Sequence, residues 1–175
     1  MAALIVALLV AAACLAQLRA QVRPPDVYFA TTRQAVANAM LALAHVTADD
    51  VVYDLGSGDG RIVILAAQRY GARGVGIEID PKLVALSRQL AIEGGVADRV
   101  RFIEGDMFTS DISPATVVTL YLSTTINAEL EPKLRRELRP GARIVSQQFP
   151  MGAWTPDQTG RALGQELFLW INSRR

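Results

Sequence analysis

Apolar residues are arranged along this chain in two alternating patterns. Short continuous apolar runs recur from Val51 onward, and longer segments with apolar residues at helical spacing lie between them. The short runs are typical of buried strands and the spaced segments of helices. Strands are therefore predicted at 51–55, 74–79, 100–103, 116–122, 142–149 and 166–171. Helices are predicted after Thr31, at 61–70, from Pro81, and along the stripe of Leu130, Leu134 and Leu138.

Two of the predicted helices carry start signals. Thr31 and Gln34 form the Thr-x-x-Gln pattern of a capping box. Asp80 and Pro81 combine an N-cap residue with a proline at the first helical position. Strands separated by helices of this length imply right-handed crossovers and a mostly parallel sheet covered on both faces. The predicted fold class is α/β, a doubly wound Rossmann-like sheet in which ligands bind at the carboxyl ends of the strands.

The start of the chain is a separate segment. The segment 1–20 is almost uninterruptedly apolar from Ala2 to Leu18, and Arg19 and Arg23 follow that run. The run is near the lower length limit of a transmembrane helix, and it lacks the positive start of a signal peptide. Because positive flanks stay in the cytoplasm, we expect an N-terminal apolar helix that anchors a cytoplasmic domain. A cleaved signal peptide and a helix lying on the domain are the alternatives. A proline-containing linker, 21–27, and a domain, 28–175, follow.

Composition excludes several classes of function. The net charge is +1, which supplies no field that would attract nucleic acid. Cys14 and His45 are the only residues of their kinds, so a disulfide within the chain and a Cys-rich metal site are excluded. A catalytic triad would require His45 as its base, but an apolar helical stretch around it favours a packing or helix-end role. The basic run at 133–139 is interpreted as the exposed face of a helix. Neither a metal nor a nucleic-acid partner is predicted.

A glycine-rich loop follows the first predicted strand. Its pattern is Asp54-x-Gly56-x-Gly58-x-Gly60, and Arg61 stands where a dinucleotide motif would place its third glycine. Gly56 and Gly60 allow backbone conformations closed to other residues, and Gly58 allows a ligand to approach the main chain. Pyrophosphate would meet acidic groups on this loop, whereas a phosphate site requires neutral or positive groups. The loop therefore favours a ligand that carries a positive charge.

Acidic residues also end the next two predicted strands. Glu78 lies about twenty residues beyond the glycines, where an acid can accept hydrogen bonds from both ribose hydroxyls. Asp106 ends the third strand, where it can accept from the amine of adenine while Met107 packs on the ring. Together these features describe S-adenosylmethionine. Its predicted binding residues are Asp54, Gly56, Ser57, Gly58, Gly60, Glu78, Ile79, Asp106 and Met107.

The chain resembles the class I, seven-strand methyltransferases that depend on S-adenosylmethionine. More narrowly, "DVYFATTRQAVANAML", "VVYDLGSGDGRIVI", "GVGIEIDPKLVALSR" and "ARIVSQQFPMGAW" resemble the small protein-lysine methyltransferases. That family includes an archaeal broad-specificity enzyme and the mitochondrial enzymes for the ATP synthase c subunit and the adenine nucleotide translocase. The resemblance implies a Rossmann-like methyltransferase fold, N-methylation of lysine in a protein substrate such as a membrane protein, and an N-terminal membrane anchor. The chain departs from the family at 28–32, where two prolines of the usual Tyr-Val-Pro-Thr-Pro are missing.

The methyl acceptor is expected beside the fourth predicted strand. Methyl transfer from a sulfonium is an in-line displacement, so holding the reactants in line and excluding water are the main requirements. An apolar or aromatic channel would favour the neutral form of a lysine amine. Tyr28, Tyr121 and Ser123 are the catalytic candidates. The expected lining of the channel is Tyr121, Leu122, Ser123 and Thr124, with Tyr28, Phe29 and Trp154 over the cofactor. Core packing is the alternative for Tyr121 and Trp154. Asn127 and Gln147 are interpreted as cap or strand-edge residues, with a hydrogen bond to the acceptor as the alternative. A methyltransferase for a small molecule or lipid and a non-catalytic cofactor-binding module are the alternative functions.

Overall fold

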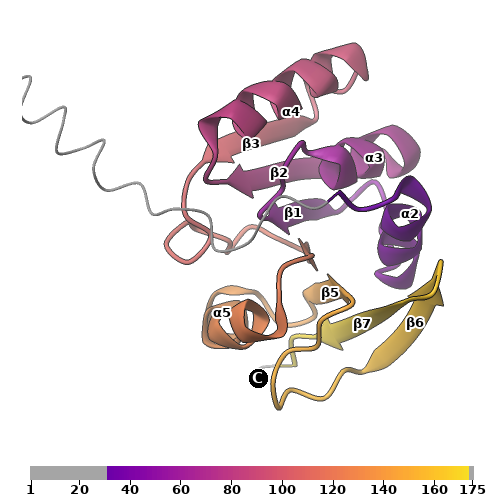
Figure 1. The fold of residues 1–175 in the computed structure, drawn as a ribbon, viewed down its shortest axis with the longest axis vertical. Coiled ribbons are helices and arrows are strands. Elements are labelled where there is room, and N and C mark those ends of the chain that lie inside the picture. Colours follow the sequence, from indigo (N-terminus) through magenta and orange to yellow (C-terminus); the bar gives the residue numbers. More distant parts are fainter. Residues whose placement is uncertain (1–30, 174–175) are drawn as a thin grey trace, which may run out of the picture.

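Seven strands form a single sheet in the part of the chain that the structure, a computed structural model, describes, residues 31–173. The strands are β1 (Val51–Leu55), β2 (Arg73–Glu78), β3 (Val100–Glu104), β4 (Val117–Leu120), β5 (Arg143–Gln147), β6 (Gln158–Ala162) and β7 (Gln165–Ile171). The helices are α2 (Gln34–Leu43), α3 (Arg61–Tyr70), α4 (Pro81–Glu93) and α5 (Thr124–Glu137). Figure 1 shows α2, α3 and α4 on one face of the sheet and α5 on the other.

The strand order is β3-β2-β1-β4-β5-β7-β6. Strands β1 to β5 pair in parallel, whereas β7 runs antiparallel to both β5 and β6. The chain builds outward from β1 to β3, then crosses back to place β4 on the other side of β1. Ligands bind at such a switch point because the loops after the two adjacent strands diverge there. The predicted doubly wound, mostly parallel sheet is confirmed, and the loops after β1 and β4 are placed beside each other.

Alternating residues of the central strands divide the core between the two faces. Val52 and Val117 pack with the apolar faces of α2, α3 and α4. Their neighbours Tyr53 and Val118 point the other way, into a cluster with Leu130 and other residues of α5. Both faces are covered, so these strands are continuously apolar, as expected for a parallel sheet. The apolar runs of the sequence therefore identify the strands that carry the loops at the switch point.

Strand β6 has no counterpart among the predicted strands. Its residues are mostly exposed and lack an apolar alternation, so the pattern that identifies buried strands is missing. A two-residue turn connects it to β7, and both turn residues, Leu163 and Gly164, have positive φ, 49° and 80°. Such turns match the twist of a hairpin. Pairing with β7, rather than burial of its own side chains, accounts for this strand.

The helix starts were predicted with mixed success. Asp80 is the N-cap of α4, and its carboxylate accepts a hydrogen bond from the Lys82 backbone N–H at 2.8 Å, as predicted. The capping box at α2 was wrong, because α2 begins after Arg33 and has no side-chain cap. The hydroxyl of the next residue, Thr32, donates to Gln147 Oε1, at 2.8 Å. His45 takes the predicted helix-end role, in the exposed turn after α2 with φ of 50°.

The basic run in α5 is only partly exposed. Arg136 and Arg139 face solvent as predicted. Lys133 is buried, and its Nζ donates to the Ser110 carbonyl and to Glu137, both at 2.7 Å. The prediction of an exposed Lys133 was therefore wrong. A buried cation is retained because it is paired and hydrogen-bonded, and it ties α5 to the loop after β3.

The predicted anchor and linker, residues 1–20 and 21–27, lie outside the described residues and stay predictions. Among residues 31–173, none of the helices combines the length and apolar character needed to cross a bilayer.

Candidate active site

A cavity of about 420 Å³ opens at the carboxyl ends of β1, β2, β3 and β4. It is lined by the glycine loop, by the ends of the next two strands, and by two residues that precede α2. The lining includes Thr31, Thr32, Asp54, Gly56, Ser57, Gly58, Asp59, Arg61, Glu78, Ile79, Leu83, Asp106, Met107, Tyr121 and Leu122. Most of the predicted cofactor residues thus surround one cavity.

The glycine loop has the backbone conformation that its sequence suggested. Gly56, Gly58 and Gly60 have φ of 73°, 55° and 78°, in the region that favours glycine. Gly56 and Ser57 donate their N–H groups to the Ile77 carbonyl, at 2.9 and 3.0 Å, which ties the loop to β2. Gly60 lies outside the cavity lining, and a Cβ there would clash with the ring of Phe102. Gly60 therefore serves the entry into α3 rather than direct contact with a ligand.

Glu78 is fixed in place by the loop it faces. Its Oε2 accepts from Gly58 N at 2.8 Å, and its Oε1 accepts from the backbone N–H groups of Ile79 and Asp80, at 2.8 and 2.9 Å. A carboxylate offers about four lone-pair sites, so most of its capacity is used inside the protein. Oε2 accepts one hydrogen bond within the protein and can accept a further one from a ligand hydroxyl. Glu78 therefore orients the glycine loop and has less capacity for two ribose hydroxyls than the sequence suggested.

Asp54 is a buried carboxyl group at the bottom of the cavity. Burial raises the pKa of Asp54 to about 7; the hydrogen bond from Thr119 Oγ1, at 2.6 Å, opposes this shift, and the charges of Glu78 and Asp59 add to it. A positively charged ligand in the cavity would stabilise the ionised form of Asp54. The acidic cavity therefore suits a cation.

Two features of the cavity lining, a buried hydroxyl group without a partner among the described residues and an apolar surface, fit S-adenosylmethionine. Ser57 Oγ is buried and has no hydrogen-bond partner among the described residues, although Ser57 lines the cavity. A buried polar atom of this kind is normally satisfied by a protein group, water or ligand. Ile79, Leu83 and Met107 offer apolar surface for an adenine ring. Asp106 also lines the cavity, and its Oδ1 accepts from the Phe108 N–H at 2.8 Å.

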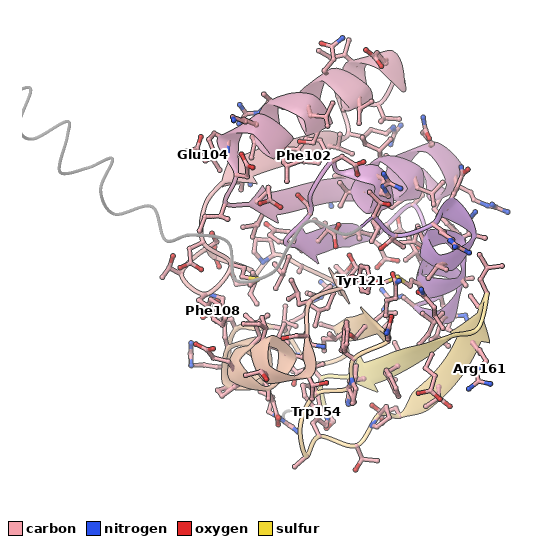
Figure 2. The ribbon with its side chains drawn as sticks, viewed as in Figure 1. Phe102, Glu104, Phe108, Tyr121, Trp154 and Arg161 are labelled. Carbon is pink, nitrogen blue, oxygen red and sulfur yellow. The ribbon has the colours of Figure 1, made fainter. Side chains whose placement is uncertain are left out.

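The predicted acceptor channel is only partly assembled. Tyr121 lines the cavity and stacks on Phe149, with ring centroids 6.1 Å apart and planes at 19°. Ser123 is the N-cap of α5 and accepts from Ile126 N at 3.2 Å, and it does not line the cavity. Trp154 also lies elsewhere, in contact with Arg135 and Trp170 and well away from Tyr121 (Figure 2). The role of Ser123 in the channel therefore stays a prediction, whereas the packing of Trp154 on Trp170 fits the alternative given for it. Tyr28 lies outside the described residues.

Three features near the cavity were not predicted. Thr32 and Arg61 line it, although the sequence indicated no site role for Thr32 and only a departure from the dinucleotide motif for Arg61. Asn127 is neither a cap nor a strand-edge residue: it is buried in α5, and its Nδ2 donates to Ser146 Oγ and to the Phe149 carbonyl, at 3.0 and 2.8 Å. These contacts hold the turn that carries Phe149 against Tyr121. No local sequence pattern indicates them, because the partners come from separate elements.

The fold and the cavity define a Rossmann-like nucleoside site of the class I methyltransferase type. A glycine loop lies at the switch point of a parallel sheet, and acids end the two strands that follow it, at Glu78 and Asp106. The family model of the ANTKMT methyltransferase domain matches residues 54–158. The chain therefore belongs to the ANTKMT methyltransferase domain family, and it is a methyltransferase that uses S-adenosylmethionine.

Known relatives agree with this assignment. A protein-lysine N-methyltransferase of Saccharolobus islandicus is 42% identical over 77% of this chain and 84% of that protein. The lysine N-methyltransferase for the ATP synthase c subunit of Mus musculus is 39% identical over 74% of this chain, which spans about half, 51%, of the mouse protein. A crystal structure of an RNA methyltransferase from Salinibacter ruber in complex with S-adenosyl-L-homocysteine is 53% identical, with a TM-score of 0.82 over 83% of this chain and 95% of that chain.

The assignment of Ser123 to a helix cap can be tested directly. Ser123→Ala is expected to lower the free energy of unfolding by about 1 kcal/mol, because the Ile126 N–H loses its partner. Turnover, measured as formation of S-adenosylhomocysteine, should stay within about twofold of wild type. Thr125→Ala, at an exposed position in the first turn of the same helix, is the matched control. A large loss of turnover with unchanged stability would return Ser123 to the acceptor channel.

Proposed function

We propose that this enzyme methylates the side-chain amines of lysine residues in protein substrates. The observation that carries the proposal is the charge of the cavity. Its lining contains the acids Asp54, Asp59, Glu78, Asp80 and Asp106, against Arg61 as the basic residue. Arg61 is itself paired with Asp59, at 2.5 Å. A site lined by negative charge concentrates cations and repels phosphates, which favours a lysine over a nucleic acid.

The names of the relatives support the same acceptor. The proteins of Saccharolobus islandicus and Mus musculus described above are both named as lysine N-methyltransferases. The Salinibacter ruber protein is described as an RNA methyltransferase, which makes RNA the principal competing acceptor. RNA recognition depends on contacts to phosphates and ribose, usually from positive groups. The acidic cavity of this chain offers the opposite charge, so we favour the lysine acceptor.

The proposed cofactor contacts follow from the positions of the lining residues. Glu78 Oε2 would accept from a ribose hydroxyl, and Ser57 Oγ would gain the partner it lacks among the described residues. Asp106 and Met107 would contact the adenine, at the end of β3. Asp54 would face the positively charged part of the ligand. Gly56 and Gly58 would give the ligand access to the backbone of the loop.

The protein's part in the reaction is to orient the reactants and exclude water. When bound, S-adenosylmethionine supplies a methyl group that the positive charge of its sulfur already activates. Tyr121 and Leu122 form the wall of the cavity after β4, and apolar surroundings disfavour the ammonium form of an entering lysine. These residues would hold the neutral amine in line with the methyl group; the N–CH3 bond would form as the CH3–S bond breaks, and the methylammonium product would then lose a proton to solvent. A basic side chain is not required. Tyr28 lies outside the described residues and is proposed as a further member of this channel from the sequence alone.

We further propose that residues 1–20 anchor the enzyme to a membrane, with its domain in the cytoplasm. The support is the apolar composition of the segment together with the arginines at its end, Arg19 and Arg23. An anchored enzyme would act on lysines close to a membrane, including those of membrane proteins. Fractionation of cells that produce the full chain or a chain lacking residues 1–20 tests this part independently of the acceptor. Recovery of both chains in the soluble fraction would contradict it.

The acceptor can be identified by following a labelled methyl group. The purified enzyme is incubated with methyl-labelled S-adenosylmethionine and with membrane proteins, RNA or a lipid extract as separate substrates. We expect label in the membrane proteins, on lysines located by mass spectrometry, and its loss when those lysines are acetylated beforehand, because acetylation removes the nucleophile. Label confined to RNA, or to the lipid extract, would contradict the proposal.

Self-methylation is the main background in this assay, and the sequence makes it easy to control. The chain contains two lysines, Lys82 and Lys133. Lys133 Nζ is held by the Ser110 carbonyl and Glu137, whereas Lys82 is exposed at the start of α4. Lys82→Arg should therefore remove label from the enzyme itself and leave labelling of the substrate unchanged.

A further inference from the structure

Arg61 joins two parts of the cavity wall. On one side its guanidinium forms a fork with Asp59 of the glycine loop, with Nε to Oδ1 at 2.9 Å and Nη2 to Oδ2 at 2.5 Å. On the other side its Nη1 donates to the backbone carbonyl of Thr32, at 2.9 Å. The same side chain therefore connects the loop after β1 with the segment before α2, 29 positions earlier in the chain.

Thr32 is also held from a second direction. Its hydroxyl donates to Gln147 Oε1 at the end of β5, at 2.8 Å. The Gln147 side-chain amide in turn donates to Gln165 Oε1 on β7. Thr32 and Gln147 are both buried, with 4% and 1% of their surface exposed. The carbonyl and the hydroxyl of Thr32 are thus fixed by α3 and by β5 respectively.

The fixation matters because this segment forms part of the cavity. Thr31 and Thr32 line it together with Gly58, Asp59 and Arg61. The helix that follows does not fix them, since α2 begins without a side-chain cap. The wall formed by Thr31 and Thr32 therefore depends on contacts from distant elements, and Arg61 is the contact that reaches it from the glycine loop.

We infer that Arg61 is a positioning residue that holds the segment of Thr31 and Thr32 against the glycine loop and so slows release of the cofactor. An arginine fork can bind a carboxylate with two parallel hydrogen bonds and still direct a third N–H elsewhere, which a lysine cannot do. The inference concerns retention of the nucleoside, so it holds whichever molecule accepts the methyl group.

The inference is tested with S-adenosylhomocysteine, which binds without methyl transfer. Its dissociation rate is measured by displacement in a stopped-flow instrument, and its Kd by calorimetry, for wild type, Arg61→Lys and Thr32→Val. We expect Arg61→Lys to raise the dissociation rate about tenfold, because a charge-assisted contact to the wall is lost. Thr32→Val, which removes only the hydroxyl bond to Gln147, should raise it about threefold. The melting temperature of the free protein should stay close to that of wild type in Arg61→Lys, whereas Thr32→Val should lower it, because the buried Gln147 Oε1 loses its donor.

Two comparisons separate positioning from a general loss of stability. Arg69→Lys is the matched control, because Arg69 lies on the same helix and its Nη1 makes a bond of 2.9 Å to Asn38, away from the cavity. This variant should release the nucleoside at the wild-type rate. Asp59→Asn should raise the rate in the same direction as Arg61→Lys, and the double variant should be no worse than the stronger single one. A dissociation rate within twofold of wild type for Arg61→Lys, or an equal rise for Arg69→Lys, would overturn the inference.

A failure of the lysine assay leaves this test unaffected. If Arg61→Lys shortens retention of S-adenosylhomocysteine while protein lysines stay unlabelled, the positioning role stands and the proposed acceptor falls. If lysines are labelled and retention of S-adenosylhomocysteine is unchanged, the proposed acceptor stands and the positioning role falls.

Discussion

Replacing Glu78 by alanine is expected to weaken binding of S-adenosylhomocysteine by at least about 100-fold. The substitution removes the acceptor for three backbone N–H groups, those of Gly58, Ile79 and Asp80. It therefore frees the glycine loop as well as removing the proposed ribose contact. Isothermal titration calorimetry measures the effect, together with a thermal melt that reports the cost of the unsatisfied donors.

A matched control for this substitution lies on the neighbouring strand. Glu104 is in register with Glu78 across β2 and β3, but it is exposed and lies outside the cavity lining. Glu104→Ala should bind the nucleoside as wild type does. Glu78→Gln keeps one oxygen acceptor and should fall between wild type and Glu78→Ala. A Glu78→Ala variant that binds within threefold of wild type would remove Glu78 from the cofactor site.

Binding of S-adenosylmethionine is expected to weaken below about pH 7 because of Asp54. Burial raises the pKa of Asp54 to about 7 in the free protein. A cation bound beside it stabilises the carboxylate, so the pKa in the complex is lower than in the free protein. Between these two pKa values the free protein carries a proton that binding must release. Affinity should therefore fall by up to about tenfold for each pH unit below 7, and this group should add no dependence above it.

Substitution of Asp54 shows whether Asp54 or another titratable group causes the pH dependence of binding. Asp54→Asn keeps the size of the side chain and an oxygen that can accept from Thr119, but it cannot ionise. The variant should bind S-adenosylmethionine about tenfold or more weakly than wild type at about pH 8, and its affinity should no longer change near pH 7. Calorimetry between about pH 5.5 and about pH 8 gives both results. An unchanged pH dependence in Asp54→Asn would show that another group titrates.

Much of the fold follows from patterns that are local in the chain. The boundaries of β1 and α3 match the predicted ranges, β2 is shifted by one residue at both ends, and β3 is longer by one residue at its end. These elements are buried by apolar residues at the spacing of a strand or a helix, so the sequence shows them directly. Strand β6 was missed because it exposes its side chains and depends on pairing with β7. Pairing partners are not encoded in the spacing of a single segment.

The candidate site also contains residues that the sequence predicts and residues that only the structure places. The positions of Asp54, Glu78 and Asp106 at successive strand ends follow from the order of strands and from the rule that parallel strands share one edge. That Gly58 donates to Glu78 also fits a loop that the next strand approaches. Tyr121 and Leu122 line the cavity, while the side chain of Ser123 caps α5, and the sequence does not show where these roles divide.

The sequence by itself determined the α/β class, the glycine loop and the acids that face it, because each depends on residues close together in the chain. Only the tertiary structure decided that Arg61 and Gln147 hold Thr32 and that Lys133 is buried. The partners of Thr32 are 29 and 115 positions away, and those of Lys133 include a loop 23 positions away. A long polar side chain can reach many partners, and which one it meets is fixed only when the packed elements bring the two together.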